Sequence, residues 1–348
     1  SVDAMGGDRG PAAVIGGMSI SARRNPDIRF IVHGDEAEIT RLMRRRGALA
    51  ERTEIRHAPE IVPMGAKPSK VMRQARGTSM MSALQAVKSG EASVAVSCGN
   101  TGALMALAML ALRRAPGVDR PAIAVFWPSR GPAGHNIVLD VGADIRADPR
   151  NLLQYAVMGA EYARVGLGLE QPRVGLLNVG AEESKGGETL HDAHEMIGAA
   201  AGRTGAGFSY VGFVEGGDIL STRCDVIVTD GFTGNVALKT AEGTARQIAE
   251  YLRSAMSRTW MTRLGYVLAR GAFQMLRDKL DPRKVNGGVF LGLNGIVIKS
   301  HGGTDAEGYA SAIDVAYDMV HNGLQAKIQH DLSEYHARNE SPMGPEAA

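Results

Sequence analysis

Three glycine-rich segments that follow apolar runs carry side chains able to bind an anion. The first, NVGAEESKGGE (178–188), directly follows the run RVGLL, and the others are SCGNTGALM (97–105) and TDGFTGNVALK (229–239). A helix that begins at such a turn offers free backbone N–H groups and a positive dipole end, which suit a phosphate-sized anion. The candidate anion-binding residues are Asn100, Thr101, Gly102, Lys185, Gly234, Asn235 and Lys239.

Each candidate also has an ordinary structural role open to it. Lys185 could be a solvated loop cation paired with Glu182 or Glu183, because surface ion pairs are common and weak. Thr101 could simply cap the helix that follows it. The location of Lys185 at the end of an apolar run, on a loop of the same type as the others, favours the binding role.

Two histidines lie in comparable places. His301 occurs with Ser300 in KSHGGTD (299–305), and His194 lies on the helical pattern that follows Lys185. Either histidine could transfer protons near neutral pH, and either could instead be structural. We therefore treat His194, His301 and Ser300 as candidate site residues.

The segment DAMGGD (3–8) places Asp3 and Asp8 around a turn with Gly6 and Gly7. Two carboxylates without other clustered ligands are weak grounds for a metal site, and we expect none. Asp3, Gly6 and Gly7 are instead candidates for substrate binding. Cys98 could act as a nucleophile, but a small buried residue at the end of a strand is the better interpretation.

Composition limits the classes of function. The 348 residues are 44% hydrophobic and 5% aromatic, carry a net charge of +2 and include two cysteines. Few aromatics and a nearly neutral charge argue against a nucleic-acid partner. We expect neither a disulfide framework nor a membrane-spanning segment. The sequence lacks the GxGxxG and GxxxxGK[ST] patterns, so we expect no nucleotide cofactor.

Apolar runs alternate with helical patterns, which predicts an α/β fold with a mainly parallel sheet and helices on both faces. One pair of runs, 121–127 and 136–142, is separated by a short loop and predicts antiparallel strands. Because parallel sheets bind ligands at the carboxyl ends of their strands, we expect the glycine-rich loops to line one cleft. We expect a single domain over 1–335 and a mobile tail over 336–348. The expected strands lie in 30–35, 92–100, 121–127, 136–142, 173–180, 224–231 and 295–302, and the expected helices in 36–46, 101–112, 151–166, 188–201, 235–257 and 305–335.

A basic amphipathic stretch, residues 246–284, holds nine basic and three acidic residues. Such a segment is typical of a helix that binds a membrane surface or a partner. We expect a helical hairpin whose helices pair across a dimer and whose tip touches lipid. The predicted membrane- or partner-binding residues at this tip are Trp260, Met261, Arg263, Leu264, Val267 and Leu268.

Taken together, the glycine-rich segments resemble those of one known family. The chain is similar to the bacterial acyl-acyl-carrier-protein:phosphate acyltransferases of phospholipid synthesis over about residues 2 to 325. Any one motif is weak, but five in this order are specific. The motifs are DAMGGD, SCGNTGALM, LNVGAEESKG, TDGFTGNVALKTAEG and GIVIKSHGGTD.

The resemblance implies a three-layer α/β/α sandwich related to the isocitrate and isopropylmalate dehydrogenases. It implies a cytoplasmic, peripherally membrane-associated homodimer that moves a long fatty acyl group from acyl carrier protein to inorganic phosphate. Lys185 and Asn235 match family positions expected to matter for activity. Cys98 departs from the family pattern, which weakens any covalent role for its thiol.

The residues support this chemistry. Phosphate attack on a thioester carbonyl needs donors for the oxyanion, and Lys185, Asn100 and Asn235 could supply them. Because the leaving group is a thiolate, a strong general acid is less necessary. The alternatives are a short-chain acyltransferase using coenzyme A, a dehydrogenase on the related fold, and a membrane-attached carrier-protein binder without catalysis.

Overall fold

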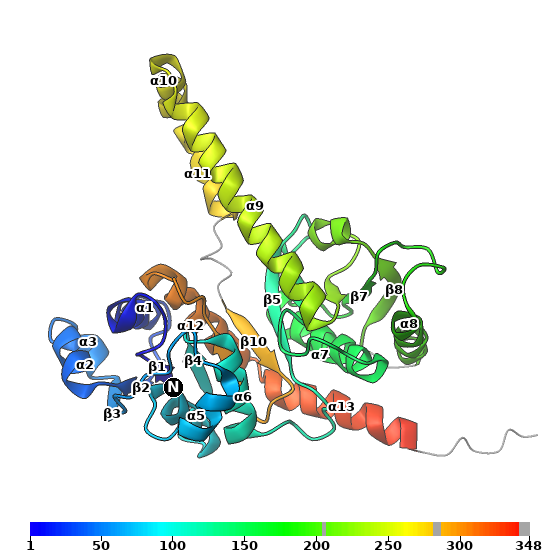
Figure 1. The fold of residues 1–348 in the computed structure, drawn as a ribbon, viewed down its shortest axis with the longest axis horizontal. Helices are drawn as coiled ribbons and strands as arrows, with labels where there is room; N and C mark the ends of the chain where they lie inside the picture. Colours follow the sequence, from blue (N-terminus) through cyan, green and yellow to red (C-terminus); the bar gives the residue numbers. More distant parts are fainter. Residues whose placement is uncertain (204–206, 281–286, 341–348) are drawn as a thin grey trace, which may run out of the picture.

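The computed structural model describes residues 1–203, 207–280 and 287–340 and places one mixed sheet through the whole protein (Figure 1). The sheet has 11 strands in the order β3-β2-β1-β4-β11-β10-β5-β6-β9-β7-β8. The strands are β1 Val2–Asp3, β2 Phe30–Gly34, β3 Thr53–His57, β4 Val94–Ser97, β5 Ala122–Pro128, β6 His135–Leu139, β7 Arg173–Leu177, β8 Ser209–Val214, β9 Val226–Val228, β10 Gly288–Leu291 and β11 Ile296–Lys299.

The direction of the strands reverses in the middle of this sheet. Strands β1, β2, β3, β4 and β11 are parallel to one another, and so are β6, β7, β8 and β9. Between these sets, β10 is antiparallel to both β11 and β5, and β5 is antiparallel to β6. The two parallel sets therefore run in opposite directions, and their carboxyl ends face opposite edges of the sheet.

Strand β5 joins the two halves of the sheet. Ala122, Ile123 and Ala124 pair with β10, whereas the rest of the strand, from Val125 to Pro128, pairs with β6. The predicted antiparallel pair at 121–127 and 136–142 is confirmed as β5 and β6. We did not predict β10, and it is this strand that places the two parallel sets in opposite orientations.

Helices cover both faces of the sheet, which confirms the three-layer α/β/α architecture. On one face, α1, α7, α12 and α13 pack on a core that includes the buried residues Met18, Tyr155, Tyr162 and Tyr309. On the other face, α4, α5, α6 and the start of α9 pack on a second core. The helices are α1 Gly10–Arg24, α2 Glu36–Met43, α3 Gly47–Ala50, α4 Pro68–Gln74, α5 Ser79–Lys88, α6 Thr101–Leu112, α7 Pro149–Leu167, α8 Glu188–Ala201, η1 Gly216–Leu220, α9 Gly231–Ser257, α10 Trp260–Leu268, α11 Arg270–Leu280, α12 Ala306–His321 and α13 Leu324–Glu340.

The predicted closing helix over 305–335 is two helices. The chain leaves α12 at Asn322 and turns at Gly323, whose φ of 68° lies in the left-handed region that favours glycine. Helix α13 then extends to Glu340, five residues into the predicted tail. The remaining residues of that tail, 341–348, lie outside the described chain.

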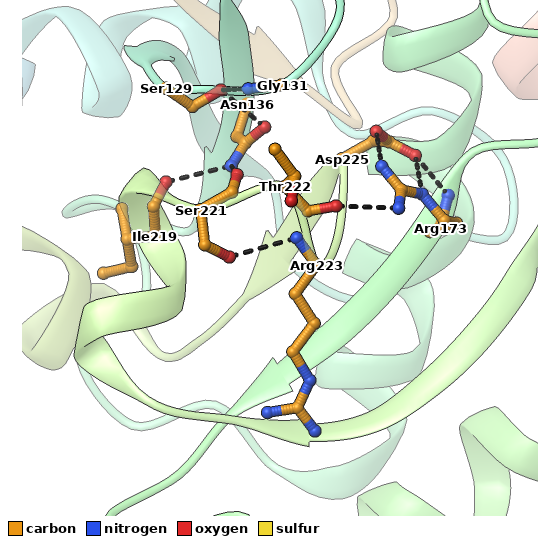
Figure 2. Close-up of polar contacts among 9 residues, drawn as sticks. All are labelled: Ser129, Gly131, Asn136, Arg173, Ile219, Ser221, Thr222, Arg223 and Asp225. Atoms are coloured by element: carbon orange, nitrogen blue, oxygen red, sulfur yellow. Dashed lines mark hydrogen bonds and ion pairs between the residues drawn. The ribbon is translucent and has the colours of Figure 1, made fainter.

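The amino ends of β6, β7 and β9 are tied together by a polar network (Figure 2). Buried Asn136 donates to the carbonyl oxygens of Ile219 and Ser221 at 3.0 and 3.1 Å. Arg173 forms a two-pronged ion pair with Asp225, the residue before β9, with N–O distances of 3.0 and 2.8 Å. Every polar group named here has a partner, so the network is structural.

A helical arm extends from this body. Helix α9 begins in the body and runs outward for 27 residues, and α10 and α11 return beside its outer part (Figure 1). We call residues 246–280 the arm, and it confirms the protruding hairpin predicted at 246–284; residues 281–286 lie outside the described chain. Among the described helices, none is long and apolar enough to cross a membrane.

Candidate active site

The loops after β1, β4 and β11, which we call the first loop group, touch one another closely. The backbone N–H of Asp8 donates to the carbonyl oxygen of Gly302 at 2.8 Å. A Cβ atom on Gly6 would lie 2.7 Å from the nitrogen of Gly99, and one on Gly7 would lie 2.7 Å from the Cys98 sulfur. Only glycine fits at these two positions, so DAMGGD, SCGNTG and KSHGGTD form one surface.

Asp3 lies beneath this surface. Its buried carboxylate accepts hydrogen bonds from the hydroxyls of Ser79 and Ser97, both at 2.6 Å. Burial raises the pKa of Asp3, and the two serine hydroxyls oppose that rise. Ser300 is also buried, and its backbone N–H donates to the Ser97 carbonyl at 2.9 Å. Both residues support the loops from below.

Asn100 is the N-cap of α6, a role that we considered for Thr101. Its side-chain oxygen accepts from the N–H of Ala103 at 2.8 Å. Its side-chain nitrogen donates to the carbonyl oxygens of Met64 and Ala66. The Asn100 amide therefore anchors a neighbouring segment, and a direct contact with phosphate would require breaking these bonds. Thr101 and Gly102 are exposed beside it.

Lys299, which we did not predict, occupies the end of β11 on the face covered by α6 and α9. Val297, two residues earlier in β11 and on the same face, is fully buried. The Lys299 amine donates a hydrogen bond to the carbonyl oxygen of Ser300. Burial, with a smaller contribution from the nearby cation of Lys239, lowers the pKa of the Lys299 ammonium to about 8. A cation at the end of an otherwise apolar strand is the signal that could have identified it.

The first three turns of α9 bring further charges to the first loop group. Lys239 pairs with Glu242 at 2.9 Å, and both lie near the exposed His301. Burial lowers the pKa of His301, Glu242 opposes the shift, and the cations of Lys239 and Lys299 contribute to it. Lys239 and Lys299 thus place two cations beside His301 where α9 passes the loops.

The loops after β6, β9 and β7, the second loop group, follow the parallel strands of the opposite direction. Asp140, at the end of β6, accepts from three backbone N–H groups of its own loop, of which the shortest bond is 2.6 Å to Asp144. A Cβ atom on Gly234 would lie 1.9 Å from the Asp140 carbonyl oxygen, so α9 can begin here only with glycine. The side chain of Asn235 donates to the Val141 carbonyl at 3.0 Å.

Lys185 lies in the same group, on the loop after β7. Its side chain is exposed, and its backbone carbonyl accepts from the side chain of Asn178 at 2.9 Å. Gly186 adopts a φ of 91°, and a Cβ there would lie 2.6 Å from the Asn178 oxygen. The loop is thus shaped by Asn178 and glycine, while the lysine amine faces solvent.

His194 lies on α8, and its ring contacts strand β8. Its ring stacks on Phe213 with a centroid distance of 4.6 Å, and its Nδ1 lies 2.8 Å from the hydroxyl of Tyr210. Both aromatic residues belong to strand β8, which forms the edge of the sheet. These contacts are typical of a structural histidine.

The Cys98 thiol is poorly suited to covalent catalysis. It is buried and donates to the Gly6 carbonyl, with a sulfur–oxygen distance of 2.9 Å. Burial, followed by the nearby Asp3, raises the pKa of this thiol to about 12. A thiol with such a pKa holds its proton at neutral pH, whereas the nucleophile is the thiolate.

The predicted site residues therefore form two groups and not one. The strands β6, β7 and β9 run opposite to β1, β4 and β11, so the loops that follow them approach from opposite strand directions. That all these loops line a single cleft stays a prediction. Helix α9 links the groups, since it begins beside Asp140 in the second and passes His301 of the first. Among the described residues, no cluster of histidine, cysteine or acidic side chains could hold a metal ion.

Comparison with solved structures finds proteins of the same fold. A phosphotransacetylase from Streptococcus pyogenes superposes with a TM-score of 0.58, covering 89% of this chain and 91% of that protein at 17% sequence identity. A branched-chain phosphotransacylase from Enterococcus faecalis gives a TM-score of 0.54 at 14% identity, covering 92% and 99% of the two chains. At these identities the likeness shows a shared fold.

Sequence comparison is more specific. A protein of Paracoccus denitrificans named phosphate acyltransferase is 60% identical over 328 residues, which cover 94% of this chain and 88% of that protein. A phosphate acyltransferase of Rhodobacter capsulatus is 55% identical over 347 residues, covering 100% and 86%. The profile of the family described as fatty acid synthesis protein matches residues 1–327. The chain therefore belongs to this family of fatty acid synthesis proteins, and its relatives are phosphate acyltransferases.

Proposed function

We propose that this acyltransferase moves a long-chain fatty acyl group from acyl carrier protein to inorganic phosphate. The product, an acyl phosphate, would supply phospholipid synthesis. The observation that carries the proposal is the similarity, over 94% or more of the chain, to proteins named phosphate acyltransferase. The glycine-rich loops at strand ends support it, because they let substrate approach the backbone closely.

In this reaction phosphate attacks the thioester carbonyl and the carrier thiolate leaves. The attacking dianion needs cations that hold it, and the developing oxyanion needs hydrogen-bond donors. We assign the phosphate-holding role to Lys185 and a donor role to Asn235, as the family resemblance implies. Lys239 and Lys299 add cations on the side of α9 that faces the first loop group.

Most of the catalysis in this scheme is positioning and electrostatics. The buried, protonated thiol of Cys98 is not used, so phosphate attacks the thioester directly and no acyl-enzyme forms. His301 is the better placed of the two candidate histidines, because it lies on the first loop group beside Lys239.

The deciding experiment measures release of free carrier thiol from long-chain acylated carrier protein, with and without phosphate. We expect release that depends on phosphate and gives acyl phosphate in equal amount. Turnover with short-chain acyl-coenzyme A but not with the carrier substrate would instead favour the soluble acyltransferase. Tight carrier binding without any release would favour the non-enzymatic binder.

We also propose that the enzyme is a cytoplasmic homodimer attached to the membrane surface through its arm. The arm exposes large apolar side chains that its own chain leaves uncovered, with Trp260 74% and Leu268 80% exposed. Along the outer part of α9, Ile248 and Tyr251 are also exposed and suit pairing with a second copy. The tip would enter the lipid interface, where aromatic and aliphatic side chains are favoured.

The tip is tested by replacing Trp260, Leu264 and Leu268 with serine. We expect loss of sedimentation with anionic liposomes, whereas release of carrier thiol in solution continues. The matched control replaces exposed Leu110 and Leu220 on the body, which should leave liposome binding intact. Unchanged sedimentation of the tip variant would contradict the assignment.

A further inference from the structure

A short basic segment, residues 61–76, lies against the first loop group and takes no part in the reaction proposed above. It contains α4, and Val71 of this helix and Ala75, its C-cap, are buried in the core beneath it. These two residues are four apart, so they lie on one side of the helix and anchor it. The remaining side of α4 faces solvent.

The solvent side of the segment is strongly positive. Lys67, Lys70, Arg73 and Arg76 are all exposed, and residues 61–76 contain no acidic residue. None of the ion pairs found among the described residues involves these four cations. Like charges at this density repel one another, and an acidic partner would relieve the repulsion.

Apolar side chains lie among these charges. Ile61, Met64 and Met72 are 50, 41 and 45% exposed. Methionine adapts its shape to a partner surface, and apolar groups beside cations suit a protein partner that presents both acidic and apolar side chains. The composition therefore matches a docking surface for a folded acidic protein.

The segment is fixed directly to the candidate site. Asn100 donates from its side chain to the carbonyl oxygens of Met64 and Ala66. A Cβ on Gly102 would lie 3.1 Å from Pro68, and one on Gly302 would lie 2.7 Å from the Met64 methyl group. A partner bound to the segment would therefore rest at the edge of the first loop group.

We propose that the basic segment, residues 61–76, is the docking surface for the acidic acyl carrier protein. The proposal rests on the proposed function, since it names the surface by which that site receives its donor. A carrier protein holds its acyl group on a long flexible prosthetic group. The folded part of the carrier therefore binds beside the site and not in it. The cations of the segment would meet the acidic face of the carrier while the thioester reaches the glycine loops.

The arm is the competing basic surface, and its chemistry suits a different partner. Its tip combines Trp260, Leu264 and Leu268 with arginines, which is typical of a segment that enters a lipid interface. The tip projects away from the body that carries both loop groups (Figure 1). The basic segment, by contrast, is bonded to Asn100 of the first loop group.

The test reverses charges on the full-length protein. Lys70→Glu with Arg73→Glu alters the exposed side of α4 and leaves Val71 and Ala75 in place. We expect binding of fluorescently labelled holo carrier protein, measured by anisotropy, to weaken by about tenfold or more and to lose most of its dependence on salt. The KM for acylated carrier protein should rise by a similar factor, with kcat at saturation nearly unchanged.

Two matched controls accompany this variant. Arg44→Glu with Arg45→Glu reverses two exposed charges at the end of α2, far along the sheet beyond β2, and should leave carrier binding intact. Arg253→Glu with Arg263→Glu reverses two charges on the arm and should weaken binding to anionic liposomes. Carrier binding by this arm variant should match that of the unaltered protein.

The outcomes separate the docking surface from the proposed reaction. If unaltered protein releases carrier thiol with phosphate but the α4 variant binds the carrier normally, the docking proposal is overturned and the reaction stands. If unaltered protein binds the carrier through α4 but gives no phosphate-dependent release, the docking surface stands and the proposed function is overturned. Loss of liposome binding alone in the α4 variant would make the segment a membrane surface and overturn the proposal.

Discussion

Asn100 provides the sharpest test of how the site is held together. Its side chain accepts one hydrogen bond as the N-cap of α6 and donates two to the segment at Met64 and Ala66. Asn100→Asp keeps the acceptor and removes both donors, whereas Asn100→Ala removes all three. The pair of variants therefore separates capping of the helix from anchoring of the segment.

The magnitudes follow from these bonds. Loss of the N-cap costs about 1 kcal/mol of stability. The two donated bonds contribute about 1 kcal/mol each at most, and the bond to Ala66, at 3.3 Å, is the weaker. The freed carbonyls can bind water, which offsets part of the loss. We therefore expect Asn100→Asp to lower the free energy of opening of the segment by about 1.4 kcal/mol, which raises the population of its open form tenfold.

Limited digestion with trypsin measures this opening, because the segment carries cleavable bonds after Lys70, Arg73 and Arg76. When opening is fast relative to cleavage, the rate follows the population of the open form. We expect about tenfold faster cleavage in both variants, and a loss of about 1 kcal/mol in global stability in Asn100→Ala alone. Cleavage after Arg44 serves as the internal control and should not change.

One outcome would contradict the anchoring role of Asn100. If Asn100→Asp resists trypsin as well as the unaltered protein does and yet loses turnover, the amide serves substrate directly. The hydrogen bonds to Met64 and Ala66 would then not be what holds the segment.

Three further predictions concern charge and reactivity. Lys185→Ala and Asn235→Ala should each lower kcat/KM roughly 30-fold or more, which is about 2 kcal/mol of transition-state stabilisation. Near-normal turnover of either folded variant would contradict the role assigned to that residue. The pKa of Lys299 is about 8 in the folded protein and 10.5 ordinarily, so the unfolded chain binds more protons between these values. The free energy of unfolding should therefore rise with pH from about 8 to 10.5 more steeply in the unaltered protein than in Lys299→Met, as denaturant titration at several pH values would measure. Parallel curves for the two proteins would contradict the lowered pKa of Lys299. Cys98→Ser should keep most of its turnover, since the thiol is protonated and buried, and inactivation of the folded variant would indicate an acyl-enzyme.

The local elements of the fold could be predicted from the sequence, but the strand order could not. The helix after Asn100 and the antiparallel β5–β6 pair follow from capping residues and from apolar runs of the right length. Strand β10 is four residues long, and no alternation marks it. Its pairing with β11 is local, but its pairing with β5 joins residues more than 150 positions apart, such as Val289 and Ala124. Local patterns carry no information on such a pairing.

The same limit applies to the site. The glycine-rich motifs lie at strand ends, as the sequence predicts, yet the orientation of Lys185 relative to His301 depends on the reversal at β10. Roles that depend on contacts were also beyond local patterns. The sequence marks Asp3 and Asn100 as polar residues in loops, whereas their hydrogen bonds to Ser79, Ser97 and Met64 come from distant parts of the chain.

The path of the chain through the sheet has a consequence for biosynthesis. The ribosome synthesises strands β1 to β4 first. Strand β11, which pairs with β4, and helix α12, which packs on α1, are synthesised only after the arm. The half built from β6, β7, β8 and β9 is continuous in sequence and can close while the ribosome is still extending the chain. The amino-terminal half must meanwhile wait with the edge of β4 and one face of α1 uncovered. Chaperones would therefore be expected to engage nascent chains that end before residue 296, and truncation there should leave an aggregation-prone product.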